Sequence, residues 1–297
     1  MNDHLSQLPV LGVGASLSLS AEPDPVSLAQ KEQGPSFVEY AGLADVEQVI
    51  DEVSRIRATG KSVLFHPSYI NFCGSYQNSK NWLKATAHHI EQVGSPWFAQ
   101  DCAYCFWQES PGYSSQFGYF IPPILNKTSL ALAIDRVKEV QDAVPVTVAI
   151  EPPPVSFVIG TMPVFSFFGE IADQTDCALL LDMGHLVSYE MANGQLVTDA
   201  LTDLPAQRVV EVHIAGGRIK QSETGPIYID SHEYEIQQQT WKMLDTMLPK
   251  LPNLKAVCFE CEGVDEKVVM STLKRIRKTV IQKSSNPELT SFLGSSQ

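Results

Sequence analysis

The sequence predicts an α/β fold, a (β/α)8 TIM barrel, and three observations carry this prediction. Short β-like runs alternate with longer amphipathic patterns, which is typical of βαβ units that build a parallel sheet. The eight expected strands follow one another without an obvious linker, and barrels commonly fill a length of 297 residues as one unit. The chain lacks the GxGxxG and GxxxxGKS/T motifs of nucleotide-binding doubly wound sheets.

The expected strands are rich in apolar and β-branched residues and are bounded by glycine, proline or polar residues. In chain order they occupy residues 10–19, 36–42, 62–70, 97–104, 146–153, 177–185, 209–216 and 256–263. Amphipathic helical patterns lie at residues 46–60, 79–94, 129–144, 164–176 and 236–250, and a last helix follows at 266–283. We therefore expect one catalytic barrel domain at residues 1–283 and a flexible tail at 284–297.

Composition limits the function classes. The hydrophobic share of 44% is ordinary for a soluble protein, and the net charge of −13 argues against nucleic acid or an anionic membrane as partner. The N-terminus has no basic region of a signal peptide, and no apolar run approaches the roughly 18 residues of a membrane span. Six cysteines are too sparse for a disulfide scaffold, so we expect reduced thiols in the cytoplasm.

Two CxxC pairs resemble half-sites of a zinc ribbon. They are formed by Cys102 with Cys105 and by Cys258 with Cys261. Both pairs lie in or beside apolar strand-like runs, where a glycine-flanked zinc knuckle is not expected. The spacing therefore does not predict structural zinc.

Polar residues gather where the expected strands end. They are His66, Asp101, Cys102, Glu151, Asp182, His185, His213, Glu260 and Glu262, joined by Asp230 and His232 in the loop after the seventh strand. Carboxyl ends of barrel strands converge on one face, and buried carboxylates are costly unless cations neutralise them. These motifs contain no Lys or Arg, so the sequence predicts a divalent metal site. His88 and His89, by contrast, lie in a helix and are expected to be surface or packing residues.

The order Glu151, Asp182, His213, Glu260 on strands five to eight resembles the ligand order of xylose-isomerase-like barrels. The ketose 3-epimerases among them also place a His three residues after the Asp, as His185 stands here. This resemblance implies a divalent-metal-dependent sugar epimerase or isomerase in which Glu151 and Glu260 move the proton.

A second resemblance covers residues 11 to 262. The segments LLLDMGHLVSYEMANG, VVEVHIAGG, YIDSHEYEIQQQTW and FECEG are similar to the multinuclear non-heme iron-dependent oxidative enzymes, the MNIO family, a branch of the same barrel superfamily. That family includes enzymes of methanobactin and 3-thiaglutamate biosynthesis. The epimerase pattern leaves the pair Asp230 and His232 unexplained, whereas the MNIO pattern includes it. The chain is therefore identified as a divergent member of the MNIO family.

The MNIO resemblance implies a set of iron ligands. One iron would be held by Glu151, Asp182, His213 and Glu260; a second by His66 with Glu151 bridging; a third by Asp230, His232 and His185. The family usually has Asp-His where this chain has Asp101-Cys102, and Asn where it has His185. Either Cys102 binds iron, or the second site is weak and fewer irons bind.

The same resemblance implies an oxidoreductase with two or three irons of mixed Fe(II) and Fe(III) and O₂ as co-substrate. Its substrate would be a Cys or a C-terminal residue of a ribosomally made peptide, or a related small substrate, in natural-product biosynthesis. A partner protein could deliver the peptide. The alternative is the sugar epimerase or isomerase, and a third class is a metal-binding module without catalysis.

Overall fold

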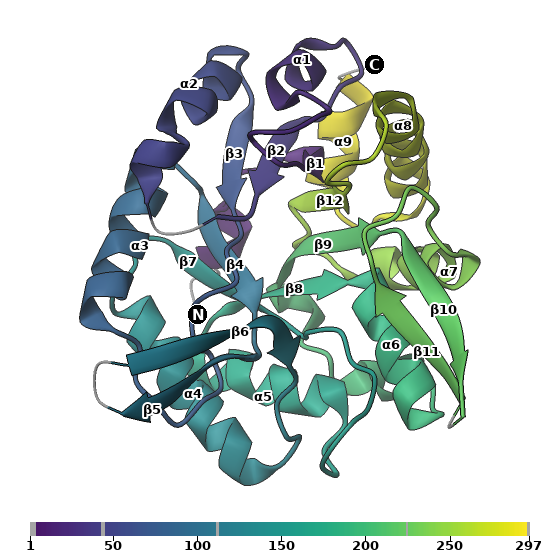
Figure 1. Cartoon of the computed structure of the whole chain (residues 1–297). Coiled ribbons are helices and arrows are strands. Elements are labelled where there is room, and N and C mark those ends of the chain that lie inside the picture. Colours follow the sequence, from purple (N-terminus) through teal and green to yellow (C-terminus); the bar gives the residue numbers. More distant parts are fainter. Residues whose placement is uncertain (1–3, 43–44, 111–112, 224, 296–297) are drawn as a thin grey trace.

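A computed structural model describes residues 4–42, 45–110, 113–223 and 225–295. Its centre is a closed barrel of eight parallel strands in the spatial order β1, β12, β9, β8, β7, β4, β3, β2 (Figure 1). The strands are β1 (Gly12–Ser16), β2 (Phe37–Tyr40), β3 (Ser62–Phe65), β4 (Trp97–Asp101), β7 (Thr147–Glu151), β8 (Ala178–Asp182), β9 (Val209–Ala215) and β12 (Ala256–Glu260). The barrel prediction is confirmed, and each barrel strand falls within an expected run.

Helices surround the barrel (Figure 1). They are α1 (Pro25–Gln30), α2 (Ile50–Ala58), α3 (Lys80–Val93), α4 (Lys127–Gln141), α5 (Val164–Thr175), α6 (Met183–Asn193), α7 (Gln238–Met247), α8 (Glu266–Lys283) and α9 (Pro287–Ser295). Short 3-10 turns lie at His4–Gln7, Val46–Gln48, Val197–Asp203, Ala206–Arg208 and Leu248–Lys250. Over the parts of the chain described, no helix has the length and apolar character needed to span a membrane.

Two antiparallel hairpins stand outside the barrel. The first consists of β5 (Tyr104–Ser110) and β6 (Tyr113–Ile121), and the second of β10 (Gly217–Ser222) and β11 (Gly225–Asp230). The second hairpin lies beside α6 (Figure 1). The sequence analysis placed Asp230 in the loop after the seventh barrel strand. Asp230 is in fact the last residue of a strand.

The barrel interior is divided into an apolar layer and a polar layer by the two-residue period of its strands. Phe37, Leu64, Ala149 and Leu180 form part of one buried cluster, which Leu5 of the first 3-10 turn joins. Two residues further along each of these strands, the inward positions are occupied by Glu39, His66, Glu151 and Asp182. The alternation therefore places carboxylates and imidazoles above the apolar layer, toward the carboxyl ends of the strands.

The C-terminal residues differ from the expected flexible tail. Residues 287–295 form α9, in which Leu289 and Leu293 are buried. The buried ammonium group of Lys255 lies 3.0 Å from Glu288 Oε2 and donates to the Ser6 carbonyl at 3.0 Å. This ion pair and the two leucines hold the helix on the barrel, and such leucines four residues apart are too few to predict a helix from sequence.

Candidate metal centre

His66 lies among three carboxylates of the polar layer. Its Nε2 atom lies 3.6 Å from Glu151 Oε2 and 3.8 Å from Asp101 Oδ2, and its Nδ1 atom lies 4.0 Å from Glu39 Oε2. Within the described residues, potential ligand atoms within 4.8 Å of one another form two groups of three. These groups are His66, Asp101, Glu151 and Glu39, His66, His213. The second group was not expected, because Glu39 was not among the predicted ligands.

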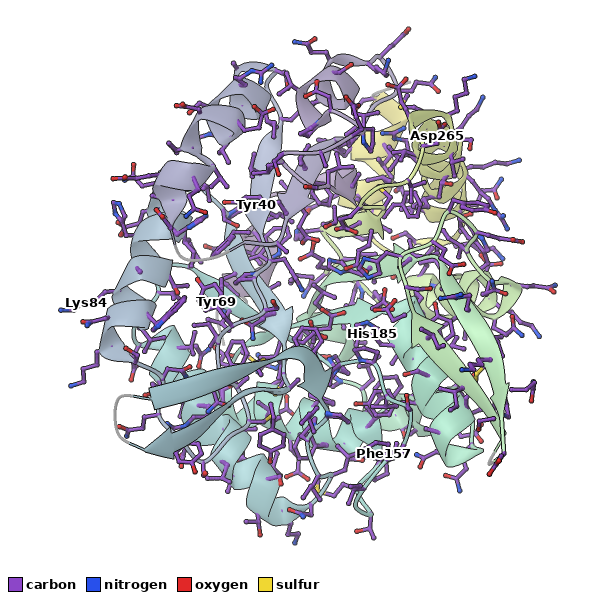
Figure 2. The ribbon with its side chains drawn as sticks, viewed as in Figure 1. Tyr40, Tyr69, Lys84, Phe157, His185 and Asp265 are labelled. Atoms are coloured by element: carbon purple, nitrogen blue, oxygen red, sulfur yellow. The ribbon has the colours of Figure 1, made fainter. Side chains whose placement is uncertain are left out.

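His185 lies between three of the predicted carboxylates. It belongs to the first turn of α6, where the Asp182 side chain caps the helix by accepting from the His185 backbone N–H at 2.7 Å. Its Nδ1 atom lies 3.0 Å from the Pro152 carbonyl oxygen and 3.1 Å from Glu151 Oε1, and its Nε2 atom lies 3.1 Å from Asp230 Oδ2. Figure 2 shows His185 toward the middle of the molecule, whereas Lys84 points outward from α3. The sequence expected His185 in a strand end, but the chain has already turned into a helix there.

The hairpin β10–β11 delivers a second acid–imidazole pair to the same place. His232 Nε2 lies 3.4 Å from Asp230 Oδ2 and 3.7 Å from Glu260 Oε2, while its Nδ1 lies 2.9 Å from Glu262 Oε2. His232 has a left-handed backbone (φ 46°), which is uncommon for a residue with a side chain and costs of order 1–3 kcal/mol. The side chains of Asp230 and His232, predicted as a pair, thus lie at the edge of the cluster.

The remaining predicted ligands also meet here. His213 Nδ1 lies 3.2 Å from Glu260 Oε1, and Asp182 Oδ1 lies 3.8 Å from His185 Nε2. Glu151, Asp182, His213 and Glu260 therefore line one connected cluster. Their own four ligand atoms do not form one of the two tight groups found among the described residues.

The pKa values of the clustered acids and imidazoles are shifted by burial and by one another's charges. Burial, together with the charge of Asp101, raises the pKa of Glu151 to about 8, and burial raises that of Asp182 to about 6. Burial opposes the charged form of His66, but its contacts with Asp101, Glu39 and Glu151 outweigh this and raise its pKa to about 9. For Glu260 the imidazoles of His232 and His213 outweigh burial and lower the pKa to about 2. The acids and imidazoles thus depend on one another for neutralisation.

The cluster contains buried polar atoms without hydrogen-bond partners. They are Glu39 Oε2, His66 Nδ1, Asp101 Oδ1, Glu151 Oε1, Asp182 Oδ2, His213 Nδ1 and Nε2, Asp230 Oδ1 and Glu260 Oε2. Among residues of described placement, no Lys or Arg forms an ion pair with these acids. Buried polar groups are normally satisfied, so this donor set fits divalent or trivalent metal ions.

Cys102 lies beside the cluster with its thiol turned to other groups. Its Sγ atom lies 3.9 Å from the Phe72 carbonyl oxygen, and Cys73 lies within hydrogen-bonding reach of it. Within the described chain it belongs to neither tight ligand group, so iron binding by Cys102 stays a prediction without a supporting contact. All six cysteines are buried and free, as expected for reduced thiols.

Two buried carboxylates of the site escaped the sequence analysis. Glu39 is the third residue of the four-residue strand FVEY. Because Tyr40 follows it, Glu39 is not the last residue of its strand and was not predicted as a strand-end ligand. Glu211 lies in the motif VVEVHIAGG but was not predicted as a residue of the site. Counting inward positions by twos, from Phe37 for Glu39 and back from His213 for Glu211, would have found both.

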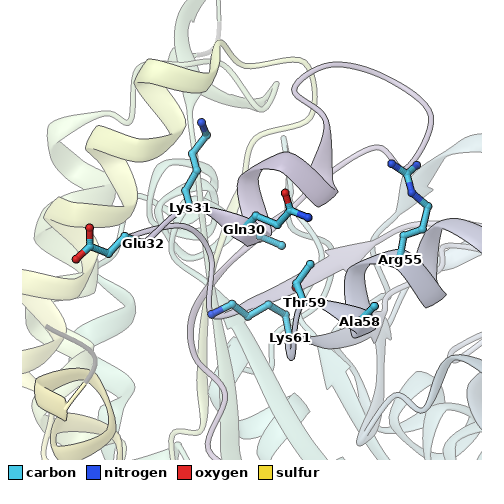
Figure 3. A pocket seen from close by; sticks show the side chains of 8 residues that line it. Gln30, Lys31, Glu32, Arg55, Ala58, Thr59 and Lys61 are labelled. Carbon is cyan, nitrogen blue, oxygen red and sulfur yellow. The ribbon is translucent and has the colours of Figure 1, made fainter.

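Two other features lie outside the cluster. His88 is exposed, whereas His89 is buried and its Nε2 lies 2.5 Å from the Tyr40 hydroxyl oxygen, so both are surface or packing residues as predicted. A surface hollow of about 450 Å³ between α1 and α2 is lined by Gln30, Lys31, Glu32, Arg55, Thr59 and Lys61 (Figure 3). Lys31 and Arg55 are paired there with Glu266 and Glu52, at 3.1 and 2.7 Å.

The chain is a closed parallel barrel with carboxylates and imidazoles at its strand ends, and it shares its fold with xylose-isomerase-like barrels. The family model described as "RiPP precursor modification enzyme MbnB/TglH/ChrH" matches residues 27–279. The chain belongs to this family and is a divergent member of the MNIO group.

Known proteins agree with this assignment. A UPF0276 protein of Vibrio parahaemolyticus is 31% identical over 163 residues, 54% of each chain. One of Streptomyces avermitilis is 25% identical over 247 residues, 82% of this chain and 49% of the other. The chain thus spans about half the length of the curated relatives it matches.

Solved structures share the fold. A xylose isomerase domain protein from Planctomyces limnophilus has a TM-score of 0.61 and 12% identity, over 93% of this chain and 99% of the other. A D-psicose 3-epimerase from Clostridium cellulolyticum H10 has a TM-score of 0.59 and 11% identity, over 92% and 99%. At these identities the likeness concerns the fold alone.

Proposed function

We propose that the protein is a multinuclear non-heme iron oxidase that uses O₂ to modify a residue of a ribosomally made peptide. The proposed residue is a Cys or the C-terminal residue of the peptide. Membership in a family described as modifying peptide precursors supports the substrate class. The observation that carries the metal chemistry is the connected cluster of carboxylates around four imidazoles, which has unsatisfied buried atoms and no Lys or Arg in contact among the described residues.

The proposed ligands divide among neighbouring positions. His66, Asp101 and Glu151 would hold one iron, and Glu151, Asp182, His213 and Glu260 would hold another. Asp230, His232 and His185 would contribute to a third. Bound iron supplies one-electron redox chemistry and a place for O₂ and for a substrate thiolate or carboxylate. With Cys102 turned toward Phe72, the His66 position has one ligand fewer than the family pattern implies, so we expect it to be the weakest.

The chain's own side chains would orient the substrate and keep water out. Apolar side chains close the barrel beneath the cluster, so access is from the side of His232, the most exposed imidazole of the site at 32%. A hollow of about 370 Å³ beside it is lined by Tyr234, Glu262, Val264 and Asp265, among others. This hollow is large enough for one or two amino-acid side chains, and we propose that the modified residue enters there.

The alternative is a sugar epimerase or isomerase that uses Glu151 and Glu260 as its acid–base pair. The structural neighbours include a D-psicose 3-epimerase, which favours this alternative at the level of fold. A single metal, however, leaves the additional acids Glu39, Asp101 and Asp230 without a role.

Metal analysis under anaerobic conditions separates the two proposals. Protein purified without O₂ is analysed for iron, manganese, cobalt and magnesium, and its iron is examined by Mössbauer spectroscopy. We expect more than one iron per chain, in mixed oxidation states, and O₂ uptake when a Cys-containing peptide is added. A single manganese, cobalt or magnesium ion with no O₂ uptake would refute the oxidase and support the epimerase.

A further inference from the structure

Glu211 is a completely buried carboxylate inside the barrel, below the predicted ligands. It lies on β9, two residues before His213, where the register against β8 shifts between the pairs Leu179–Val209 and Leu180–Glu211. A shift of this kind is a β-bulge, which re-aims the following side chain. The bulge brings Glu211 level with the inward Leu180 and beneath His213.

The two oxygens of Glu211 face two different side chains. Trp97 Nε1 donates to Oε2 at 2.7 Å, whereas Oε1 lies 3.6 Å from Nε2 of His213, and neither of these last two atoms has a hydrogen-bond partner. The same Nε2 lies 3.2 Å from Glu39 Oε1, while the other ring nitrogen, Nδ1, lies 3.2 Å from Glu260 Oε1. Over the described part of the chain, Glu211 belongs to neither group of potential metal ligands. Carboxylates thus flank His213 on both edges of its ring.

We infer that Glu211 is a positioning residue, which holds the N–H of His213 at Nε2 and so presents the lone pair of Nδ1 to the metal on the Glu260 side. Metal-binding histidines usually donate their second N–H to a carboxylate or carbonyl group, which fixes the ring and strengthens its donation to the metal. Glu39 Oε1, at 3.2 Å, is the nearer carboxylate oxygen to that nitrogen and would share its N–H with Glu211. This inference rests on the proposed metal function and adds the way in which the chain selects one nitrogen of His213.

A purely structural role does not explain why this position holds a glutamate. Satisfying the Trp97 indole needs only one neutral acceptor oxygen, and a glutamine would supply it without the cost of burying a charge. A carboxylate differs in accepting from two donors at once. The side-chain nitrogen that lies beside the other oxygen is Nε2 of His213, at 3.6 Å.

The test uses Glu211→Gln, Trp97→Phe and the double variant, with Co(II) as the probe. Metal-free protein is titrated with Co(II) without O₂ in competition with a chelator, and the visible spectrum reports the coordination of the bound ion. In Glu211→Gln the single amide oxygen is held by Trp97, so the amide NH₂ faces His213. We expect Co(II) affinity to fall about 10- to 100-fold, with a changed spectrum.

The other two variants separate positioning from packing. Trp97→Phe keeps the carboxylate for His213, so its affinity should stay within a few-fold of wild type. In the double variant the amide oxygen is free to turn to His213, and affinity should recover relative to Glu211→Gln. If Glu211→Gln fails to fold, Glu211→Asp, which withdraws the carboxylate by one methylene, is titrated in its place.

The outcomes distinguish this inference from the function on which it rests. Wild-type affinity and spectrum in Glu211→Gln, or a double variant that binds more weakly than Glu211→Gln, would overturn the role of Glu211 and leave the metal centre intact. A wild-type protein that binds metal with the predicted dependence on Glu211 but consumes no O₂ would overturn only the oxidase proposal.

Discussion

Replacing Glu151 by glutamine should stabilise the metal-free protein while weakening its stabilisation by metal. Glu151 is fully buried beside Asp101, and its pKa is raised from 4.5 to about 8. Below pH 4.5 the folded and unfolded chains both carry the proton, so the raised pKa has no effect on stability. As the pH rises from 4.5 to 8, the unfolded chain loses the proton that the folded chain keeps, and stability falls.

The size of the effect follows from the same values. Each pH unit in that window costs about 1.4 kcal/mol, so at pH 7 the wild-type chain loses about 3 kcal/mol that Glu151→Gln does not lose. At about 2 °C per kcal/mol for a chain of this size, the variant should melt roughly 6 °C higher. Iron at a hundred times its dissociation constant would stabilise wild type by about 2.7 kcal/mol per site, and the variant much less.

The assay is thermal unfolding of chelator-treated protein at pH 5 and pH 7.5, repeated with Fe(II) in the absence of O₂. The matched control is Glu170→Gln, since Glu170 is an exposed acid on α5; it should melt like wild type under every condition. Two results would refute this reasoning. One is a metal-free Glu151→Gln protein that is less stable than wild type at pH 7.5, and the other is equal stabilisation of both proteins by Fe(II).

Three further predictions concern single side chains. Asp182→Asn should fold, because asparagine can also cap α6, but should lose the metal bound near Glu260; full metal content by mass spectrometry would contradict the role of Asp182. Cys102→Ser should keep the iron content of wild type, since the thiol faces the Phe72 carbonyl, and a loss of one iron per chain would instead show that Cys102 is a ligand. Burial lowers the pKa of His89 to about 4. Below pH 6.5 the unfolded chain therefore takes up a proton that the folded chain does not, and the protein becomes less stable as the pH is lowered. Between pH 7 and pH 5, His89→Gln should lose about 2 kcal/mol less than wild type in urea unfolding, and an equal loss would contradict this.

The barrel and most of its site could be read from the sequence because their signals are local. A run of four apolar residues that ends in an acid, such as ALLLD at 178–182, predicts both a buried strand and the acid at its end. The structure adds what depends on register. Glu211 lies two residues before His213, so the two-residue period of β9 points it inward, and the bulge against β8 sets it level with Leu180. The helix start at Met183 likewise converts His185 from a strand-end residue into one that reaches across to Asp230.

The second hairpin favours more than one cation in the proposed metal centre. The barrel strands alone bring six carboxylates together, those of Glu39, Asp101, Glu151, Asp182, Glu211 and Glu260, and one divalent ion with two protonated imidazoles balances at most four of them. The strand β11 then adds Asp230 at the point where His185 and His232 converge, 3.1 and 3.4 Å from its Oδ2 atom. A sugar epimerase with one metal gains nothing from this further acid, which is costly to bury. A left-handed residue at His232 adds a backbone cost, and both costs are offset if further metal binds between the hairpin and the barrel. The hairpin therefore adds to the support for a multinuclear centre over a mononuclear one.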